Sequence, residues 1–84
     1  MIKMNGLTNM GLSSNEAKEQ RIMKLRRDFN DKKVITVQGA VEKTGYSAAT
    51  IIKYAKEGEI PLWDNKKNES VVPINNSNRP KWLK

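Results

Sequence analysis

The sequence contains neither cysteine nor histidine among its 84 residues. Without cysteine there is no disulfide and no thiolate nucleophile, and the loss of both residue types excludes a histidine-based catalytic triad and nearly every zinc site. No apolar run approaches the ~20 residues that a transmembrane helix requires. We therefore expect no cofactor, no metal, no catalytic residue, no small-molecule substrate and no membrane contact.

Aromatic residues are also scarce, at 6% of the chain. A chain this short buries only about 60% of the surface that it exposes when unfolded, so a single domain with a thin core is expected. The first residues, MIKMNGLTNMGLSS, lack the apolar segment of an export signal, which together with the absence of cysteine indicates a cytoplasmic protein.

Positive charge is what the sequence has in excess. Its 16 lysines and arginines against nine acidic residues give a net charge of +7. A small basic protein attracts polyanions such as nucleic acids, because its cations displace the counterions of phosphates. The alternative is that the lysines only keep the surface soluble.

The N-terminal part divides into an arm and a helix. Residues 1–12 are rich in Asn, Gly and Met, and we predict a flexible arm. The run from Ser13 to Glu16 is typical of a capping box, and apolar residues at helical spacing then predict a helix from Ser14 to Asn30. Basic side chains cover its other faces, which either contact phosphates or are simply solvated: Lys18, Arg21, Lys24, Arg26 and Arg27.

Two shorter helices are predicted next, separated by a sharp turn. Thr36 is suited to cap a helix from Val37 to Lys43, and Gly45 supplies the left-handed backbone that ends it. Ser47 caps a third helix, from Ala48 to about Lys56, and Gly58 lets the chain reverse after it. The apolar residues expected to meet between these helices are Val37, Ala40, Val41, Ile51, Tyr54 and Ala55.

A hairpin and a polar tail complete the prediction. Two short extended runs, Ile60–Trp63 and Ser70–Ile74, flank turn-forming residues and predict a wing. Trp63 either packs the wing onto the helices, which we favour, or stacks on a base. The folded domain is expected to span residues 13–74, followed by a basic tail, residues 75–84. In this tail Trp82 has three open roles: stacking on nucleotides, folding back on the core, or binding a partner.

The stretch from Thr36 to Pro61 resembles the MerR/excisionase-type winged helix-turn-helix family. The motif positions filled here are Thr36, Ala40, Thr44, Gly45, Ser47, Thr50, Ile51, Tyr54, Gly58, Ile60 and Pro61. The resemblance implies a mainly α fold of three helices plus a small β-hairpin as the wing. It also implies that the third helix approaches a DNA groove and that the wing tip meets phosphate or the minor groove. Such domains serve excisionases, regulators, replication proteins of mobile elements and small accessory subunits.

The expected nucleic-acid contacts lie on the first helix, the third helix and the wing: Arg21, Lys24, Arg27, Ser47, Ala49, Thr50, Lys53, Lys56, Lys66 and Lys67. The expected contacts to a partner protein are Ala48, Ile52 and Trp82. The third helix lacks arginine, the usual reader of guanine edges, so low sequence specificity is expected. Residues 34–59 are also neutral, with three lysines against three glutamates, and the surplus charge lies on either side of them.

Two functions follow from these features. In the first, the protein binds DNA, double- or single-stranded, with low specificity during mobile-element recombination, regulation or replication. In the second, it is an accessory subunit that binds a replication or recombination enzyme and helps it engage nucleic acid. A stand-alone enzyme is set aside, because no acid–base or metal-binding set is present.

Overall fold

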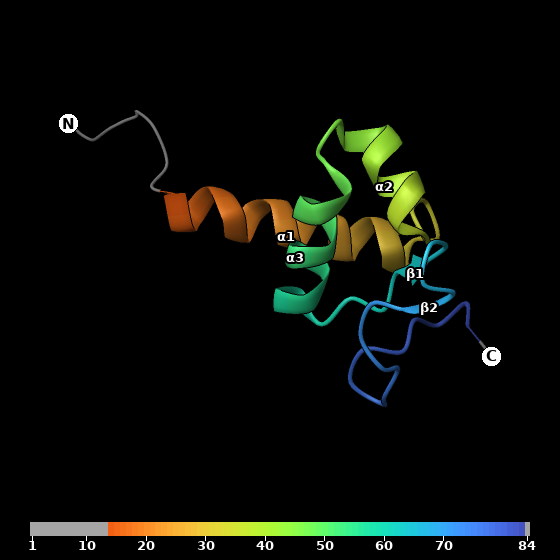
Figure 1. Cartoon of the computed structure of the whole chain (residues 1–84). Helices are drawn as coiled ribbons and strands as arrows, with labels where there is room; N and C mark the ends of the chain where they lie inside the picture. Colours follow the sequence, from red (N-terminus) through yellow and green to blue (C-terminus); the bar gives the residue numbers. More distant parts are fainter. Residues whose placement is uncertain (1–13, 84) are drawn as a thin grey trace.

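The computed structural model describes residues 14–83 and contains three helices, α1 (Ser14–Asn30), α2 (Val37–Thr44) and α3 (Ala48–Gly58) (Figure 1). The prediction for the first helix is confirmed at both ends, and the other two helices run one and two residues beyond their predicted ends. The predicted arm, residues 1–12, and the predicted capping residue Ser13 lie outside the described residues. No helix in the described part is long and apolar enough to cross a membrane.

Local hydrogen bonds cap both ends of α2 and the beginning of α3, and so fix the turn between the two helices. The Thr36 hydroxyl accepts the amide hydrogen of Gly39 at 2.9 Å and caps α2. Gly45 ends α2 with a φ of 80°, and its amide donates to the Val41 carbonyl. Ser47 then caps α3 by accepting from the Thr50 amide at 3.2 Å. The predicted sharp bend at Gly45 is therefore confirmed.

The core lies where α3 crosses α1 and where α2 and the chain after α3 close over it (Figure 1). Its members come from every helix, from the connection between α1 and α2 and from the segment before the hairpin: Ile22, Leu25, Phe29, Val34, Val37, Ala40, Ile51, Tyr54, Ala55, Ile60 and Leu62. Side chains such as Ile51 and Leu62 are almost fully buried, which stabilises the fold by about 1.5–3 kcal/mol each. Ile51 and Tyr54 are core residues, as predicted, whereas Val41 is only half-buried.

The end of α3 differs from the prediction that Gly58 supplies the reversal. The residue in the left-handed conformation is Glu59, with a φ of 53°, and Gly58 is the last residue of the helix. Gly58 is needed for close packing, because a Cβ atom there would overlap Cγ2 of Ile22 on α1. The Arg26 guanidinium also donates to the Gly58 carbonyl at 2.7 Å. At this point the backbone of α3 thus lies directly against side chains of α1.

The hairpin is shorter than predicted. Strands β1 (Trp63–Asp64) and β2 (Glu69–Ser70) pair antiparallel, with Asp64 opposite Glu69. One further rung joins the Val71 amide to the Leu62 carbonyl at 2.8 Å. Pro61 cannot donate to a ladder, which limits the extension of pairing toward α3.

The hairpin is attached to the helices through its backbone. The Trp63 amide donates to the Ile35 carbonyl at 3.0 Å, beside an isolated parallel bridge to Thr36. We expected the Trp63 side chain to pack the wing onto the helices, but it is 40% exposed and does not belong to the core. Its neighbour Leu62 is buried in the core and takes that role.

The segment predicted as a tail folds back onto α1. The Trp82 indole donates to the Phe29 carbonyl at 2.7 Å, and the two rings meet edge to face with centroids 5.2 Å apart. Lys32 lies 5.7 Å from the Trp82 ring centroid, and Pro80 is buried. Of the three roles left open for Trp82, folding back on the core is the one that this structure has.

Candidate nucleic-acid interface

The outer face of α3 carries exposed polar and small residues. Ser47, Ala49, Lys53 and Lys56 are exposed, and Thr50 is half-buried. The Ser47 hydroxyl donates to the Thr50 hydroxyl at 2.9 Å and accepts from the Thr50 amide, so it acts both as a donor and as an acceptor within the cap. The hydrogen of the Thr50 hydroxyl then has no acceptor among residues 14–83 and remains able to donate to a ligand.

The loop at the tip of the hairpin is organised by Asp64. Its carboxylate is buried and accepts the amide hydrogens of Lys66 at 3.0 Å and Lys67 at 3.4 Å. Its carbonyl accepts from Asn68, which has a positive φ of 58°. Asp at the first position of a loop commonly makes such Asx-type bonds, and this preference could have predicted the role of Asp64, which the sequence analysis missed. The arrangement leaves the side chains of Lys66 and Lys67 exposed.

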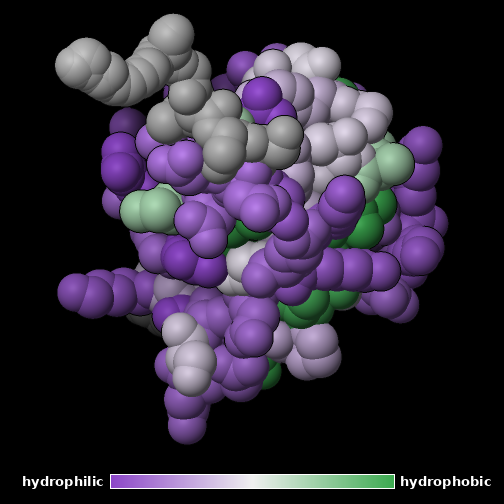
Figure 2. Space-filling model, turned by 90° about the vertical axis from the view of Figure 1, so that its left-hand side faces the viewer, coloured by the Kyte–Doolittle hydropathy of each residue, from purple (hydrophilic) through white to green (hydrophobic). Residues whose placement is uncertain are grey.

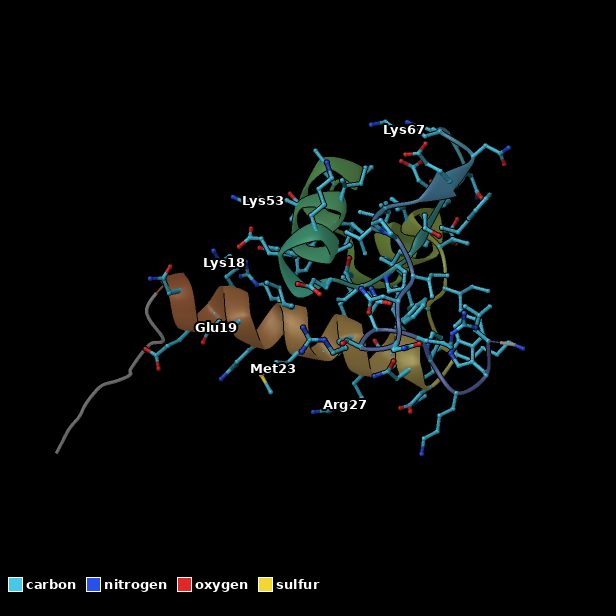
Figure 3. All side chains as sticks on the ribbon, turned by 90° about the horizontal axis from the view of Figure 1, so that it is seen from below. Lys18, Glu19, Met23, Arg27, Lys53 and Lys67 are labelled. Carbon is cyan, nitrogen blue, oxygen red and sulfur yellow. The ribbon has the colours of Figure 1, made fainter. Side chains whose placement is uncertain are left out.

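α3 and the hairpin present their lysines on one side of the molecule. Figure 3 shows Lys53 of α3 and Lys67 of the hairpin tip on the same side, above α1. Within residues 14–83, no side-chain hydrogen bond or ion pair occupies the ammonium groups of these residues or of Lys56 and Lys66. The structure thus places Lys53 and Lys67, which the sequence assigned to the third helix and the wing, on one side of the molecule.

The basic residues of α1 do not join this face as a group. Lys18 forms an ion pair with Glu57 of α3 at 2.8 Å, and Arg26 is bound to the end of α3. Arg27, predicted to contact nucleic acid, points away on the opposite side of α1, next to Met23 (Figure 3). Three of the basic residues of α1 are therefore either bound to α3 or directed away from the lysines of α3 and the hairpin.

Arg21, a predicted contact, is held between α1 and α3. Its guanidinium donates to the Tyr54 hydroxyl at 3.2 Å and lies 5.4 Å from the centroid of the Tyr46 ring. The hydrogen bond to Tyr54 is the main cause that raises the pKa of Arg21 above its ordinary value. Arg21 is therefore cationic, but part of its guanidinium is occupied by its contacts with Tyr54 and Tyr46.

The ion pair between Lys18 and Glu57 is a surface pair. The two side chains are 34% and 36% exposed. Their mutual hydrogen bond raises the pKa of Lys18 and lowers the pKa of Glu57. Exposed pairs of this kind stabilise a fold little, so this pair links α1 to α3 but contributes only weakly to stability.

The residues predicted to contact a partner protein are all partly covered. Ala48, Ile52 and Trp82 are each half-buried and pack against the core. For Ile52 the reason is that α3 contacts α1 on one side and α2 on another, so its buried stripe is wider than that of a helix with one neighbour. The large apolar side chains that are exposed lie elsewhere: Met23, Ile35, Trp63 and Ile74.

Figure 2 shows the face at the beginning of α1, where most of the coloured surface is hydrophilic and hydrophobic residues form small separate areas. Among residues 14–83 no three His, Cys, Asp or Glu residues are grouped closely enough to hold a metal ion.

Comparison with known proteins places the chain in no family. The sequence matches no protein-family model, and neither the curated proteins nor the solved structures contain a match to it.

Proposed function

We propose that the protein is a non-enzymatic winged helix-turn-helix protein of the MerR/excisionase type that binds DNA through α3 and the hairpin. The observation that carries the proposal is the placement of Lys53 and Lys67 on one side, from two elements separated in sequence (Figure 3). In such a fold the first turn of the recognition helix enters the major groove while the wing meets the flanking backbone. The capped first turn of α3 and the ordered lysine loop supply both parts.

Binding is expected to depend on phosphates more than on bases. Lys53, Lys56, Lys66 and Lys67 supply charge but no arginine fork for a guanine edge. Ala49 and the Thr50 methyl offer only apolar contacts, of the kind that suit thymine methyl groups. A low-specificity DNA-binding protein of a mobile element, acting in recombination, regulation or replication, matches these properties.

Fluorescence anisotropy with a labelled duplex, measured over a range of salt concentrations, tests the proposal. The isolated protein should bind with micromolar or better affinity, and the logarithm of the binding constant should fall steeply with the logarithm of salt concentration. Replacing one phosphate-contacting lysine should reduce this slope by about one. The test variants are Lys53→Gln and Lys67→Gln, and Arg27→Gln is the matched control, because Arg27 points away from both (Figure 3).

Two results would argue against DNA binding by this face. One is affinity too weak to measure at low salt. The other is an equal loss from all three variants, since that would reflect net charge rather than a docking surface.

A second candidate is an accessory subunit that binds a replication or recombination enzyme. The observation in its favour is the exposure of Trp63 and Ile35, which a backbone hydrogen bond holds side by side at the base of the hairpin. Tryptophan is enriched in protein interfaces and among the residues that contribute most to their affinity. DNA binding that appears only in the presence of such an enzyme, and that Trp63→Ala abolishes, would support this function over the first.

A further inference from the structure

A pocket of about 220 Å³ lies between α1 and the turn that joins α2 to α3. Its polar walls come from α1, from the end of α2 and from α3, and include Arg21, Lys24, Asp28, Lys43, Tyr46 and Tyr54. Since a water molecule occupies about 30 Å³ of liquid volume, the pocket has room for a phosphate group with several waters.

The charge of the pocket is positive. Three cations, Arg21, Lys24 and Lys43, face a single carboxylate, Asp28. Asp28 is buried, and its carboxylate is already paired with the Lys43 ammonium at 3.1 Å. Two positive charges therefore remain uncompensated by the side chains that line the pocket. The larger cleft of about 680 Å³ at the other end of α3 offers no such excess, because its lining balances three cations, Arg26, Arg79 and Lys81, against three carboxylates, Asp31, Glu57 and Glu59.

The pocket also holds hydrogen-bond donors that the fold leaves unused. Tyr54 is 8% exposed, and its hydroxyl oxygen accepts from Arg21, so the hydroxyl hydrogen has no acceptor among residues 14–83. Arg21 uses one N–H group for that bond, and a guanidinium carries several more. Lys24 has no side-chain partner in the described part of the chain. Of these donors only Tyr54 belongs to a buried residue, for which an unused donor is costly, whereas Arg21 and Lys24 are exposed; an anion in the pocket would accept from all three.

We infer that this pocket binds a phosphate group, held by Arg21, Lys24 and the Tyr54 hydroxyl, with Lys43 at its rim. The inference deepens the proposed DNA-binding function: it places a backbone phosphate of the duplex behind the turn that leads into α3. The walls of the pocket include Thr44 and Tyr46, directly before the α3 cap at Ser47. A nucleic-acid strand that follows the first turn of α3 passes this turn.

Titration with inorganic phosphate, followed by ¹H–¹⁵N NMR, tests the pocket without DNA. Phosphate should shift the backbone resonances of Thr44 and Tyr46 in a saturable way, and Lys24→Gln should abolish the saturation. The matched control is Arg27→Gln, which removes the same charge from the same helix but does not line the pocket. Asp28→Asn should tighten phosphate binding, because it removes the one carboxylate of the pocket.

Titration with a duplex tests the source of the phosphate. Lys24→Gln should reduce the salt slope of duplex binding by about one, and Arg27→Gln should leave it unchanged. Far-UV circular dichroism of each variant checks that the helices persist.

The results separate the two proposals. Absence of saturable phosphate shifts at the pocket, or equal effects of Lys24→Gln and Arg27→Gln, overturns the inference even if the duplex binds through Lys53 and Lys67. Saturable phosphate binding that depends on Lys24, in a protein that does not bind duplex, overturns the proposed DNA-binding function. The pocket then stands as a site for a free phosphate or for the phosphate of a nucleotide.

Discussion

Replacing Trp82 by alanine should destabilise the whole domain, although Trp82 lies near the end of the chain. The last carbonyls of a helix lack partners within the helix, and Phe29 is in the last turn of α1. Its carbonyl accepts two hydrogens, from the Lys32 amide at 3.0 Å and from the Trp82 indole at 2.7 Å. Trp82 therefore caps α1 from a position 53 residues later in the sequence.

The magnitude follows from the three contacts of the ring. The edge-to-face pair with Phe29 contributes about 0.5–1.5 kcal/mol, and the indole hydrogen bond contributes a similar amount, about 0.5–1.5 kcal/mol. The Lys32 ammonium near the ring adds about 0.5–1 kcal/mol. Trp82→Ala should then cost roughly 1.5–4 kcal/mol in the free energy of unfolding, whereas Trp82→Phe, which keeps a ring but loses the hydrogen bond, should cost about 1 kcal/mol.

Urea denaturation followed by circular dichroism at 222 nm measures both costs, since helix signal does not depend on the tryptophan that is removed. For a domain of this size, 1 kcal/mol corresponds to a shift of about 4–8 °C in Tm, so thermal denaturation gives an independent check. Trp63→Ala is the matched control, because that side chain is 40% exposed and does not belong to the core. If Trp82→Ala unfolds at the same urea concentration as the unmodified protein, the helix-capping role is refuted.

Three further outcomes are expected. Gly58→Ala should destabilise the fold by about 1–3 kcal/mol in urea denaturation, because the added methyl group meets Ile22; an unchanged midpoint would show that α1 can move away. Asp64→Ala should cost about 1–2 kcal/mol and weaken duplex binding, because the lysine loop loses its two side-chain bonds; unaltered binding would mean that the loop order is irrelevant. The pKa of Glu57 lies below its ordinary value because of its hydrogen bond to Lys18, so the pair stabilises the fold weakly at neutral pH. This contribution is lost as the pH falls through the pKa that Glu57 has in the folded protein. In an NMR pH titration, Lys18→Gln should raise the midpoint of the Glu57 titration.

Features set by neighbours in sequence could be predicted from the sequence. The bounds of α1, the cap at Ser47 and the bend at Gly45 depend on residues within one helical turn, and the structure agrees with each of them. Ile51 and Tyr54 were recognised as core residues because helical spacing alone places them on one face.

Features set by partners distant in sequence could not be predicted in this way. Nothing near Trp82 in the sequence indicates that its indole reaches Phe29, so the sequence leaves three roles open for this residue. Arg21 and Arg26 look like exposed cations in the sequence, but their acceptors lie on α3, more than 30 residues later. Gly58 was assigned to the turn on the preference of glycine for positive φ, whereas packing against α1 is what requires it.

Contacts between residues distant in sequence also decide which cations are available at the candidate interface. The net charge of +7 suggests a strong and diffuse attraction to nucleic acid, yet the cations of α1 are divided among three roles. Lys18 and Arg26 are bonded to α3, Arg21 and Lys24 line a pocket, and Arg27 points away from the lysines of α3 and the hairpin. A duplex that docks on α3 therefore gains little from Arg27, while diffuse attraction would use it as fully as Lys53. The losses of duplex affinity caused by Lys53→Gln and Arg27→Gln should be compared at one salt concentration. A larger loss from Lys53→Gln indicates a docked complex, and equal losses indicate non-specific electrostatic attraction.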